Sequence, residues 1–304
     1  MSNIHLIKQV RKHDDEYYTQ YKDIENELKN YEQYFRDKIV YCNCDSASSN
    51  FVKYFQNNFD RLGLKKLNYS SCDFRSDKSI YTLMHSDIIC TNPPFSYIKD
   101  FVDILMKYKK QFLCIGTRHL IGYSGYFSYF KNYDFWVSAS RSNNSSHFLD
   151  INGIEKIINC YWYTNIGSYP KREFIVTGQI YDKEKYPSYY NCVAIHVDSV
   201  KSIPDDYYGL MGVPENFIEH LNPKQFDLMY SQYDIPLTKN RKSYKSRNKI
   251  VYIEDGKEVL SFDYTLNLGK KGNAPCYFKD GKLIFPFQRI FIKRKPHSKQ
   301  TLQG

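Results

Sequence analysis

The sequence predicts an α/β fold, in which a mostly parallel sheet has helices on both faces and a smaller β-rich C-terminal region follows. Three observations lead to this prediction. Apolar strand patterns alternate with helical patterns up to about residue 165, which is typical of parallel sheets. Polar residues directly follow several of these strands. Beyond residues 168–190, which contain Pro170 and Pro187 and few aliphatic residues, the pattern changes to short strands and loops.

Each element has its own signal in the chain. Helical spacing of Tyr21, Ile24 and Leu28 predicts a helix from Glu16 to about Phe35. Strands are predicted at residues 39–43, 65–69, 87–91, 111–116, 134–139 and 159–165, and further helices at 49–62, 77–85, 97–109 and 125–131. Gly63 is expected to end the second helix, because glycine readily adopts the left-handed conformation of a helix C-terminus. In the β-rich region, Asp255-Gly256 and Asp280-Gly281 predict hairpin turns.

Length and composition limit the class of protein. The 304 residues are enough for a large core, and we expect one domain over residues 1–167 and a second over residues 168–304. A mean hydropathy of -0.61, with no long apolar run, argues against a membrane segment, and the N-terminus shows no signal peptide. The eight cysteines form no Cys-x-x-Cys pair and have no histidine at zinc-ligand spacing. We therefore expect reduced thiols, no metal site and a cytoplasmic location.

Positive charge is concentrated in the second part of the chain. Residues 168–304 carry 22 basic and 15 acidic residues, whereas residues 1–167 carry 21 and 18. Six of the basic residues fall close together: Lys239, Arg241, Lys242, Lys245, Arg247 and Lys249. Such a cluster is suited to bind the phosphates of a nucleic acid. The alternative is a solvated charge run without a partner.

The tetrapeptide Asn92-Pro93-Pro94-Phe95 follows a predicted buried strand. Two prolines can continue neither a strand nor a helix, so the chain must leave the sheet in a fixed turn. The Asn92 amide and the Pro93 carbonyl could then accept the hydrogens of a planar base's exocyclic amine, while Phe95 stacks on the base. Two acceptors would direct the amine lone pair at an electrophilic methyl group. The motif therefore predicts methyl transfer to an amino group, and a plain Pro-Pro turn is the alternative.

Two acidic residues follow other predicted strands. In open α/β sheets, ligands bind outside the carboxyl ends of the strands, so Asp45, Asp73 and Asn92 are expected at one edge. Asp45 would contact the methionine end or ribose of S-adenosylmethionine, and Asp73 the adenine amine of this cofactor. Each acid could instead cap the next helix. No glycine-rich loop follows the first strand of the sheet.

The chain resembles the EcoRI-type adenine-specific DNA methyltransferases over most of its length. The resemblance is carried by residues 15–21, 23–28, 40–45, 49–51, 62–67, 73–76, 91–96, Trp162, 164–165, 211–214, 222–223 and 225–226. It implies a Rossmann-like methyltransferase sheet that uses S-adenosylmethionine and no metal to methylate N6 of a flipped adenine in duplex DNA. The catalytic set is then Asn92, Pro93, Pro94 and Phe95. The cofactor set is Tyr17, Tyr18, Thr19, Asn43, Asp45, Asp73, Phe74 and Asn92, with Tyr18 and Thr19 at the methionine end.

The remaining expectations concern partners and rival functions. The region 168–304 is expected to recognise double-stranded DNA, and the enzyme to act as a monomer in a restriction-modification system or as a solitary or phage enzyme, with no membrane and no stable endonuclease complex. The rivals are an RNA or protein-glutamine amino-methyltransferase, which could use a similar turn, and a catalytically silent DNA-binding relative.

Overall fold

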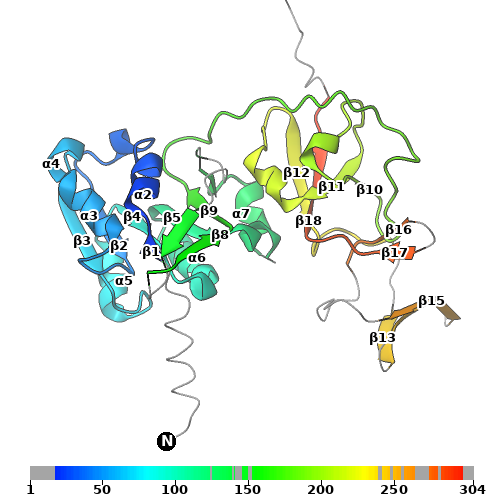
Figure 1. Cartoon of the computed structure of the whole chain (residues 1–304), viewed down its shortest axis with the longest axis horizontal. Helices are drawn as coiled ribbons and strands as arrows, with labels where there is room; N and C mark the ends of the chain where they lie inside the picture. The colour runs from blue at the N-terminus through cyan, green and yellow to red at the C-terminus, as the bar shows by residue number, and fades with distance from the viewer. Residues whose placement is uncertain are drawn as a thin grey trace, which may run out of the picture. The chain divides into compact units, whose positions relative to one another are not determined.

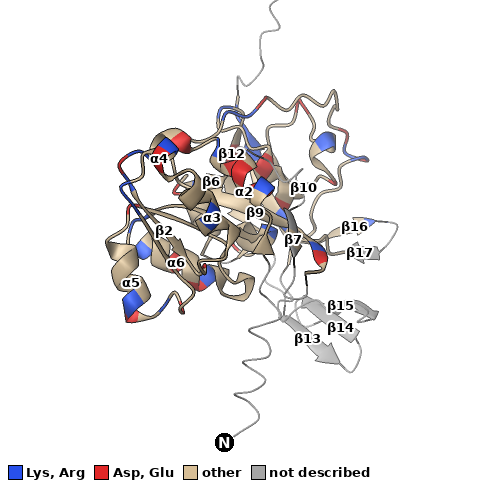
Figure 2. Cartoon of the chain, turned by 60° about the vertical axis from the view of Figure 1, so that its left-hand side comes forward, with Lys and Arg blue, Asp and Glu red and all other residues tan. Residues whose placement is uncertain are grey.

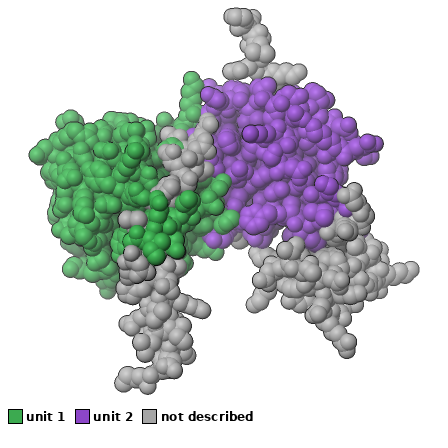
Figure 3. Space-filling model, in the orientation of Figure 1, with its two compact units in different colours: residues 1–120, 132–171 green, residues 121–131, 172–304 purple. Residues whose placement is uncertain are grey.

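The computed structural model describes residues 18–123, 125–138, 140, 146–149, 153–238, 242–246, 249–254, 257–263, 274–279 and 282–296. The chain divides into two compact units, which are coloured separately in Figure 3. Unit 1 comprises Met1–Leu120 and Asn132–Lys171, and unit 2 comprises Ile121–Lys131 and Arg172–Gly304. The chain thus enters unit 2 for residues 121–131, returns to unit 1, and stays in unit 2 after Lys171.

Unit 1 is built on a six-stranded, mostly parallel sheet (Figure 1). Its order is β3 (Lys66–Ser70), β2 (Ile39–Asn43), β4 (Ile88–Thr91), β5 (Gln111–Thr117), β9 (Cys160–Thr164) and β6 (Trp136–Val137). The first four strands are parallel, and β9 runs antiparallel to both β5 and β6. The parallel strands are short apolar runs because both faces of such a sheet are covered. The predicted α/β class is therefore confirmed.

Helices cover both faces of this sheet. On one face α2 (Tyr21–Leu28) and α3 (Asn50–Asn57) share a buried core with β2, β4 and β5, to which Ile115 belongs. On the other face α5 (Asp77–Met84) contacts β2 and α6 (Ile98–Lys107) contacts β5. Neighbouring strand residues point to opposite faces. Accordingly, a Cβ atom at Gly116 would lie 2.9 Å from Ile98 of α6.

The first predicted helix is shorter than expected. Helix α2 begins at Tyr21, and a 3-10 turn η1 (Glu32–Tyr34) follows it, so the helix over residues 16–35 was wrong at both ends. Upstream, β1 (Tyr18–Thr19) pairs with β7 (Ser146–Leu149), which in turn pairs with β8 (Glu155–Ile158). None of these three strands was predicted, because β1 is stabilised by a partner far along the chain.

The second predicted helix is broken in two. Helix α3 ends before Asn58, and α4 (Phe59–Leu62) follows at once. The side-chain amide of Asn58 donates to the Tyr54 carbonyl at 2.8 Å, a local bond that competes with the helical pattern. Gly63 then ends α4 with φ +63°, as its position predicted.

Unit 2 is rich in strands, which confirms the predicted β-rich C-terminal region. A four-stranded sheet has the order β10 (Ile195–His196), β11 (Leu210–Pro214), β18 (Arg289–Arg294) and β12 (Phe226–Ser231). Two further groups are β13 (Lys242–Ser246), β14 (Lys249–Glu254) and β15 (Lys257–Asp263), and β16 (Tyr277–Lys279) with β17 (Lys282–Ile284). The predicted hairpin residues 255–256 and 280–281 lie outside the described residues, but the strands on either side of each pair antiparallel.

Other short elements complete the chain. These are 3-10 helices η2 (Phe95–Tyr97), η3 (Arg118–Gly122), η4 (Val200–Ser202) and η5 (Glu215–Glu219), and helix α7 (Phe127–Lys131). Helix α7 belongs to unit 2 and contacts β12. Within the described ranges, we find no helix with the length and apolar character needed to cross a membrane.

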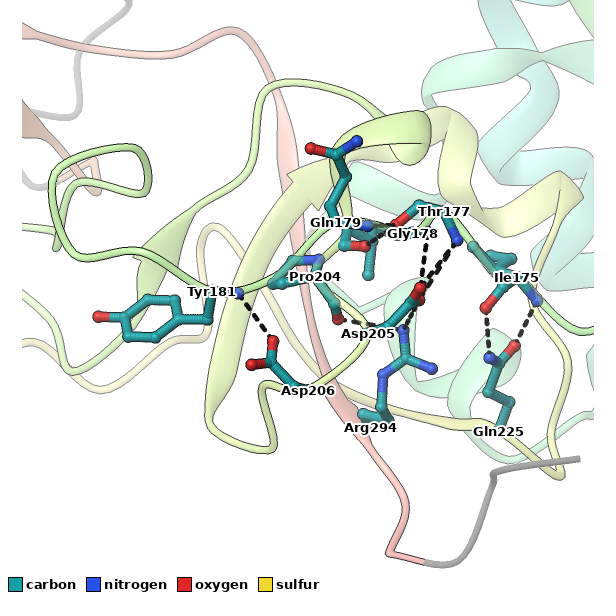
Figure 4. A network of polar contacts seen from close by, with 11 residues as sticks. Ile175, Thr177, Gly178, Gln179, Tyr181, Pro204, Asp205, Asp206, Gln225 and Arg294 are labelled. Carbon is teal, nitrogen blue, oxygen red and sulfur yellow. Dashed lines mark hydrogen bonds and ion pairs between the residues drawn. The ribbon is translucent and has the colours of Figure 1, made fainter. Parts of the chain in front are cut away.

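Residues 172–181 of unit 2 form a segment that belongs to no helix or strand, and part of it is drawn in Figure 4. Its backbone is held by side chains instead. Gln225 bonds both the amide and the carbonyl of Ile175, at 2.7 Å each. Asp205 accepts from the amides of Thr177 and Gly178, and it also pairs with Arg294 at 3.2 Å. The segment is thereby attached to unit 2 along its length.

Candidate active site

A cavity of about 380 Å³ lies in unit 1, at the carboxyl ends of β2 and β4. It is lined by Tyr18, Thr19, Cys44, Asp45, Ser46, Ser48, Ser49, Asn50, Phe51, Lys53, Ser71, Asn92, Pro93, Pro94 and Phe95. This is the edge at which parallel α/β sheets bind ligands. The cavity therefore joins the Asn-Pro-Pro-Phe motif to residues from three other segments of the chain.

The motif leaves the sheet where β4 ends. Thr91 is the last residue of the strand, and η2 begins at Phe95. Between them Pro94 has φ -56° and ψ 123°, and its carbonyl accepts from the amide of Tyr97 at 2.9 Å. The ring of Phe95 packs edge-on against Phe148 of β7, with 5.9 Å between the ring centroids. The predicted fixed turn is present, and strand β7 supports its aromatic residue.

Asp45, which follows β2, lines one side of the cavity. It is 7% exposed, and its Oδ2 atom lies 2.6 Å from the Thr91 hydroxyl. Burial raises the pKa of this carboxyl to about 7, whereas hydrogen bonds from Thr91 and Ser49 act in the opposite direction. A group with this pKa changes charge near neutral pH, and it faces a cavity.

Tyr18 and Thr19 form the wall that β1 contributes. The Asn50 side chain donates to the Thr19 carbonyl at 2.8 Å, which ties this wall to the first turn of α3. Thr19 is buried, and its hydroxyl has no hydrogen-bond partner among the described residues. Tyr18 is 46% exposed. A buried hydroxyl without a partner, beside serines and Lys53, suits a polar ligand with an amino-acid end.

Three candidate cofactor residues do not line the cavity. Asp73 is exposed and accepts from the backbone amide and guanidinium of Arg75 at 2.8–3.0 Å. Phe74 is buried against Phe101 of α6. Asn43 is fully buried, and its side-chain amide has no partner within the part of the chain described. Tyr17 lies outside the described residues.

Comparison with known proteins identifies the family. The family described as "Adenine-specific methyltransferase EcoRI" matches residues 5–72 and 68–295. The chain belongs to this family. Type II methyltransferase M.EcoRI of Escherichia coli is 37% identical, with 74% of this chain and 88% of the relative covered. Type II methyltransferases M.MgeORF184P of Mycoplasma genitalium and M.MpnI of Mycoplasma pneumoniae are 36% and 34% identical, each with 74% of this chain and 85% of the relative covered. No solved structure matches the chain.

Membership of the EcoRI methyltransferase family makes this chain a DNA methyltransferase of the S-adenosylmethionine-dependent class. The cavity fits that cofactor in the character of its lining, which combines hydroxyls, a carboxyl group and aromatic rings. When bound, the cofactor supplies an electrophilic methyl group. No group of three His, Cys, Asp or Glu side chains is placed to hold a metal ion within the described ranges.

Several lining residues were not among the predicted site residues. They are Cys44, Ser46, Ser48, Ser49, Asn50, Phe51, Lys53 and Ser71. Ser49 was visible as a helix start, since it is the N-cap of α3 and accepts from the Val52 amide at 3.2 Å. No local pattern in the sequence indicated the role of Thr91, which supports the lining residue Asp45 from behind the cavity, because the two residues are distant in the sequence.

The basic cluster lies in unit 2. Lys239, Arg241 and Arg247 fall outside the described residues. Lys242 and Lys245 belong to β13, and Lys249 begins β14. On the helices α4 and α5 of unit 1, by contrast, Lys and Arg are interspersed with Asp and Glu (Figure 2). The predicted phosphate contacts of the cluster stay a prediction.

Proposed function

We propose that this EcoRI-family enzyme methylates the N6 amine of a specific adenine in duplex DNA. The observation that carries the proposal is the Asn92-Pro93-Pro94-Phe95 turn, which lines the same cavity as Asp45, Tyr18 and Thr19. In our proposal Asn92 and the Pro93 carbonyl accept the two amine hydrogens, and Phe95 stacks on the base. The amine nitrogen then has its lone pair directed at the methyl group.

The reaction needs little beyond correct placement. The lone pair of an aromatic amine is delocalised, so two acceptors held by a rigid turn would increase its availability in the required direction. Proximity and orientation can supply most of the acceleration in such a step. Asp45, Tyr18 and Thr19 would hold the cofactor from the lining of the cavity. Asn43, Asp73 and Phe74 do not line the cavity, so we assign them no direct contact with the cofactor.

The adenine must leave the duplex to reach this cavity. Flipping a base costs about a few kcal/mol. We propose that residues 168–304 form the DNA-recognition region and that phosphate contacts by the basic cluster offset this cost. The enzyme would act as a monomer on the DNA of a bacterial or phage-infected cell, for modification with or without a partner endonuclease that forms no stable complex.

The test is transfer of a labelled methyl group from S-adenosylmethionine to duplex DNA, RNA and protein in parallel. We expect label in duplex DNA, recovered after digestion as N6-methyladenine. Label in RNA or in glutamine would instead support the rival substrates. Binding of DNA without cofactor binding in calorimetry would identify a silent relative.

A further inference from the structure

The Thr91 hydroxyl lies between two acceptors. Its oxygen is 2.6 Å from Oδ2 of Asp45, and it also forms a short contact with the backbone carbonyl oxygen of Asn43. A hydroxyl carries one hydrogen and can donate it only once. The Asn43 carbonyl can only accept. Both contacts are hydrogen bonds if Thr91 donates to Asn43 and a protonated Asp45 donates to Thr91.

Burial favours the arrangement in which a protonated Asp45 donates to Thr91 and Thr91 donates to Asn43. Thr91 is fully buried and does not line the cavity, so its hydroxyl has no access to a hydrogen from solvent water. Burial also raises the pKa of Asp45 to about 7. The hydrogen bond from Thr91 would lower that pKa only if its hydrogen pointed to the carboxylate. When the hydrogen goes to Asn43, the charged form of Asp45 loses this stabilisation.

The thiols on the strands around Asp45 do not stabilise its charged form. Strand β2 and its end contribute the thiols of Cys42 and Cys44, and β4 contributes the thiol of Cys90. Burial raises the pKa of all three thiols, and the neighbouring Asp45 raises each further. On the α3 side, the hydroxyl of Ser49 bonds Asp45 and favours its charged form, and Lys53 is the one cation that lines the cavity among the described residues.

We propose that Asp45 is a neutral carboxylic acid in the free protein and that it releases its proton to the solvent when the positively charged methionine end of the cofactor binds. Thr91 is the positioning residue that holds the acid. The O–H bond of the carboxyl group breaks, the proton passes to the buffer, and the carboxylate balances the positive charge of the ligand. This inference depends on the proposed function, because it assigns the cofactor to this cavity.

The first test uses the free, full-length protein. We expect carbon NMR of labelled aspartate carboxyl groups to show one group titrating near pH 7, where Asp45 is placed. This signal should vanish in Asp45→Asn and persist in Asp103→Asn, which removes an exposed carboxylate from α6. An ordinary acidic midpoint for every aspartate would overturn the proposal.

Thr91 variants decide the direction of the hydrogen bond. Thr91→Val removes the acceptor of the neutral acid, so the midpoint of Asp45 should fall, whereas Thr91→Ser should leave it in place. If Thr91 instead donates to a carboxylate, Thr91→Val would raise the midpoint, and this result contradicts the proposal.

The second test is calorimetry of cofactor binding in buffers of different ionisation enthalpy. S-Adenosylmethionine should release close to one proton at pH values below 7, and its affinity should rise by up to about tenfold per pH unit until the pKa is passed. Asp45→Asn should abolish the release. S-Adenosylhomocysteine keeps the ammonium group but lacks the sulfonium, so release with this ligand assigns the effect to the ammonium. Methylthioadenosine, which lacks the amino-acid end, should release none.

The outcomes separate the two proposals. Binding of S-adenosylmethionine without proton release, or with equal release in Asp45→Asn, overturns the inference and leaves the proposed function intact. Failure of the cofactor to bind at all contradicts the proposed function. The NMR titration of the free protein then still decides whether Asp45 is neutral.

Discussion

Asn92 and Asp45 line one cavity from the ends of two neighbouring strands. They have different tasks in the proposed reaction, since Asn92 would hold the target amine and Asp45 the cofactor. Thr91 connects the two, because it precedes Asn92 in the chain and bonds Asp45 through its side chain. At this scale a single hydroxyl links the two sides of the site.

Asn92→Ala should remove most methyl transfer and largely spare DNA binding. Loss of one preorganised polar group typically lowers kcat by about 10²- to 10³-fold. Single-turnover transfer of labelled methyl groups, with separate binding titrations, measures both quantities. Asn30→Ala, which changes an exposed asparagine of the same unit, is the control. Full activity of the Asn92 variant would refute the proposed role.

Asp45 should also affect stability in a pH-dependent way. Its pKa is raised from 3.8 to about 7, so the folded protein binds a proton there that the unfolded chain loses. The contribution of Asp45 to the free energy of unfolding must therefore fall as pH rises from about 4 to 7. Denaturant unfolding of the wild type and Asp45→Asn should show Asp45→Asn gaining relative stability across this window. A constant difference would contradict the raised pKa.

The sequence indicated site residues at the ends of strands, but it did not predict contacts between residues that are distant in the chain. Asn92 and Asp45 line the same cavity because parallel strands bring their carboxyl ends together. Asp73 also follows a strand, but Arg75 binds its carboxylate outside the cavity. A strand end therefore indicates the edge of the sheet, while the direction of the side chain depends on its neighbours.

Helix α3 contributes its first turn to the cavity wall. Ser49 caps this helix, and Ser76 caps α5 in the same way, accepting from the Ser79 amide at 3.3 Å. Of these two capping serines, only Ser49 lines the cavity. The two serines therefore form a matched pair, in which one cap is also part of the site.

Ser49→Ala and Ser76→Ala should each lower the free energy of unfolding by about 1 kcal/mol, the usual cost of losing an N-cap. Ser49→Ala should in addition weaken cofactor binding, because its hydroxyl lines the cavity and bonds Asp45. Denaturant unfolding and calorimetry measure the two effects. Equal cofactor affinity in the two variants would show that Ser49 only caps the helix.

Elements of the sheet were more predictable than those that support it. Strands β2, β4 and β5 are short apolar runs, and their predicted bounds agree closely with those observed. Strand β1 has only two residues and no apolar pattern of its own. It forms because β7 pairs with it, a contact between residues far apart in the sequence.

At the scale of the whole molecule, most of the excess positive charge lies in residues 168–304, which carry 22 basic and 15 acidic residues against 21 and 18 in residues 1–167. If this region binds duplex DNA, then its cations displace counterions from the phosphates, and the affinity must fall as the salt concentration rises. Mixed charges on unit 1 would contribute little to this effect.

Changing Lys242, Lys245 and Arg247 to Gln should weaken DNA binding and flatten its salt dependence. Loss of three phosphate contacts would reduce the slope of log affinity against log salt by up to about 2.7. Changing the exposed Lys65, Lys66 and Lys78 of unit 1 to Gln is the charge-matched control. An unchanged slope in the first variant would indicate a solvated charge run.

The attachment of residues 172–181 has a consequence for motion. Amides of Ile175, Thr177, Gly178 and Tyr181 donate to the side chains of Gln225, Asp205 and Asp206, so they should exchange deuterium slowly despite lying in no strand. Gln225→Ala should speed exchange at Ile175 more than at Tyr181. Slow exchange along this stretch would show that three side chains can protect a backbone from water as a neighbouring strand does.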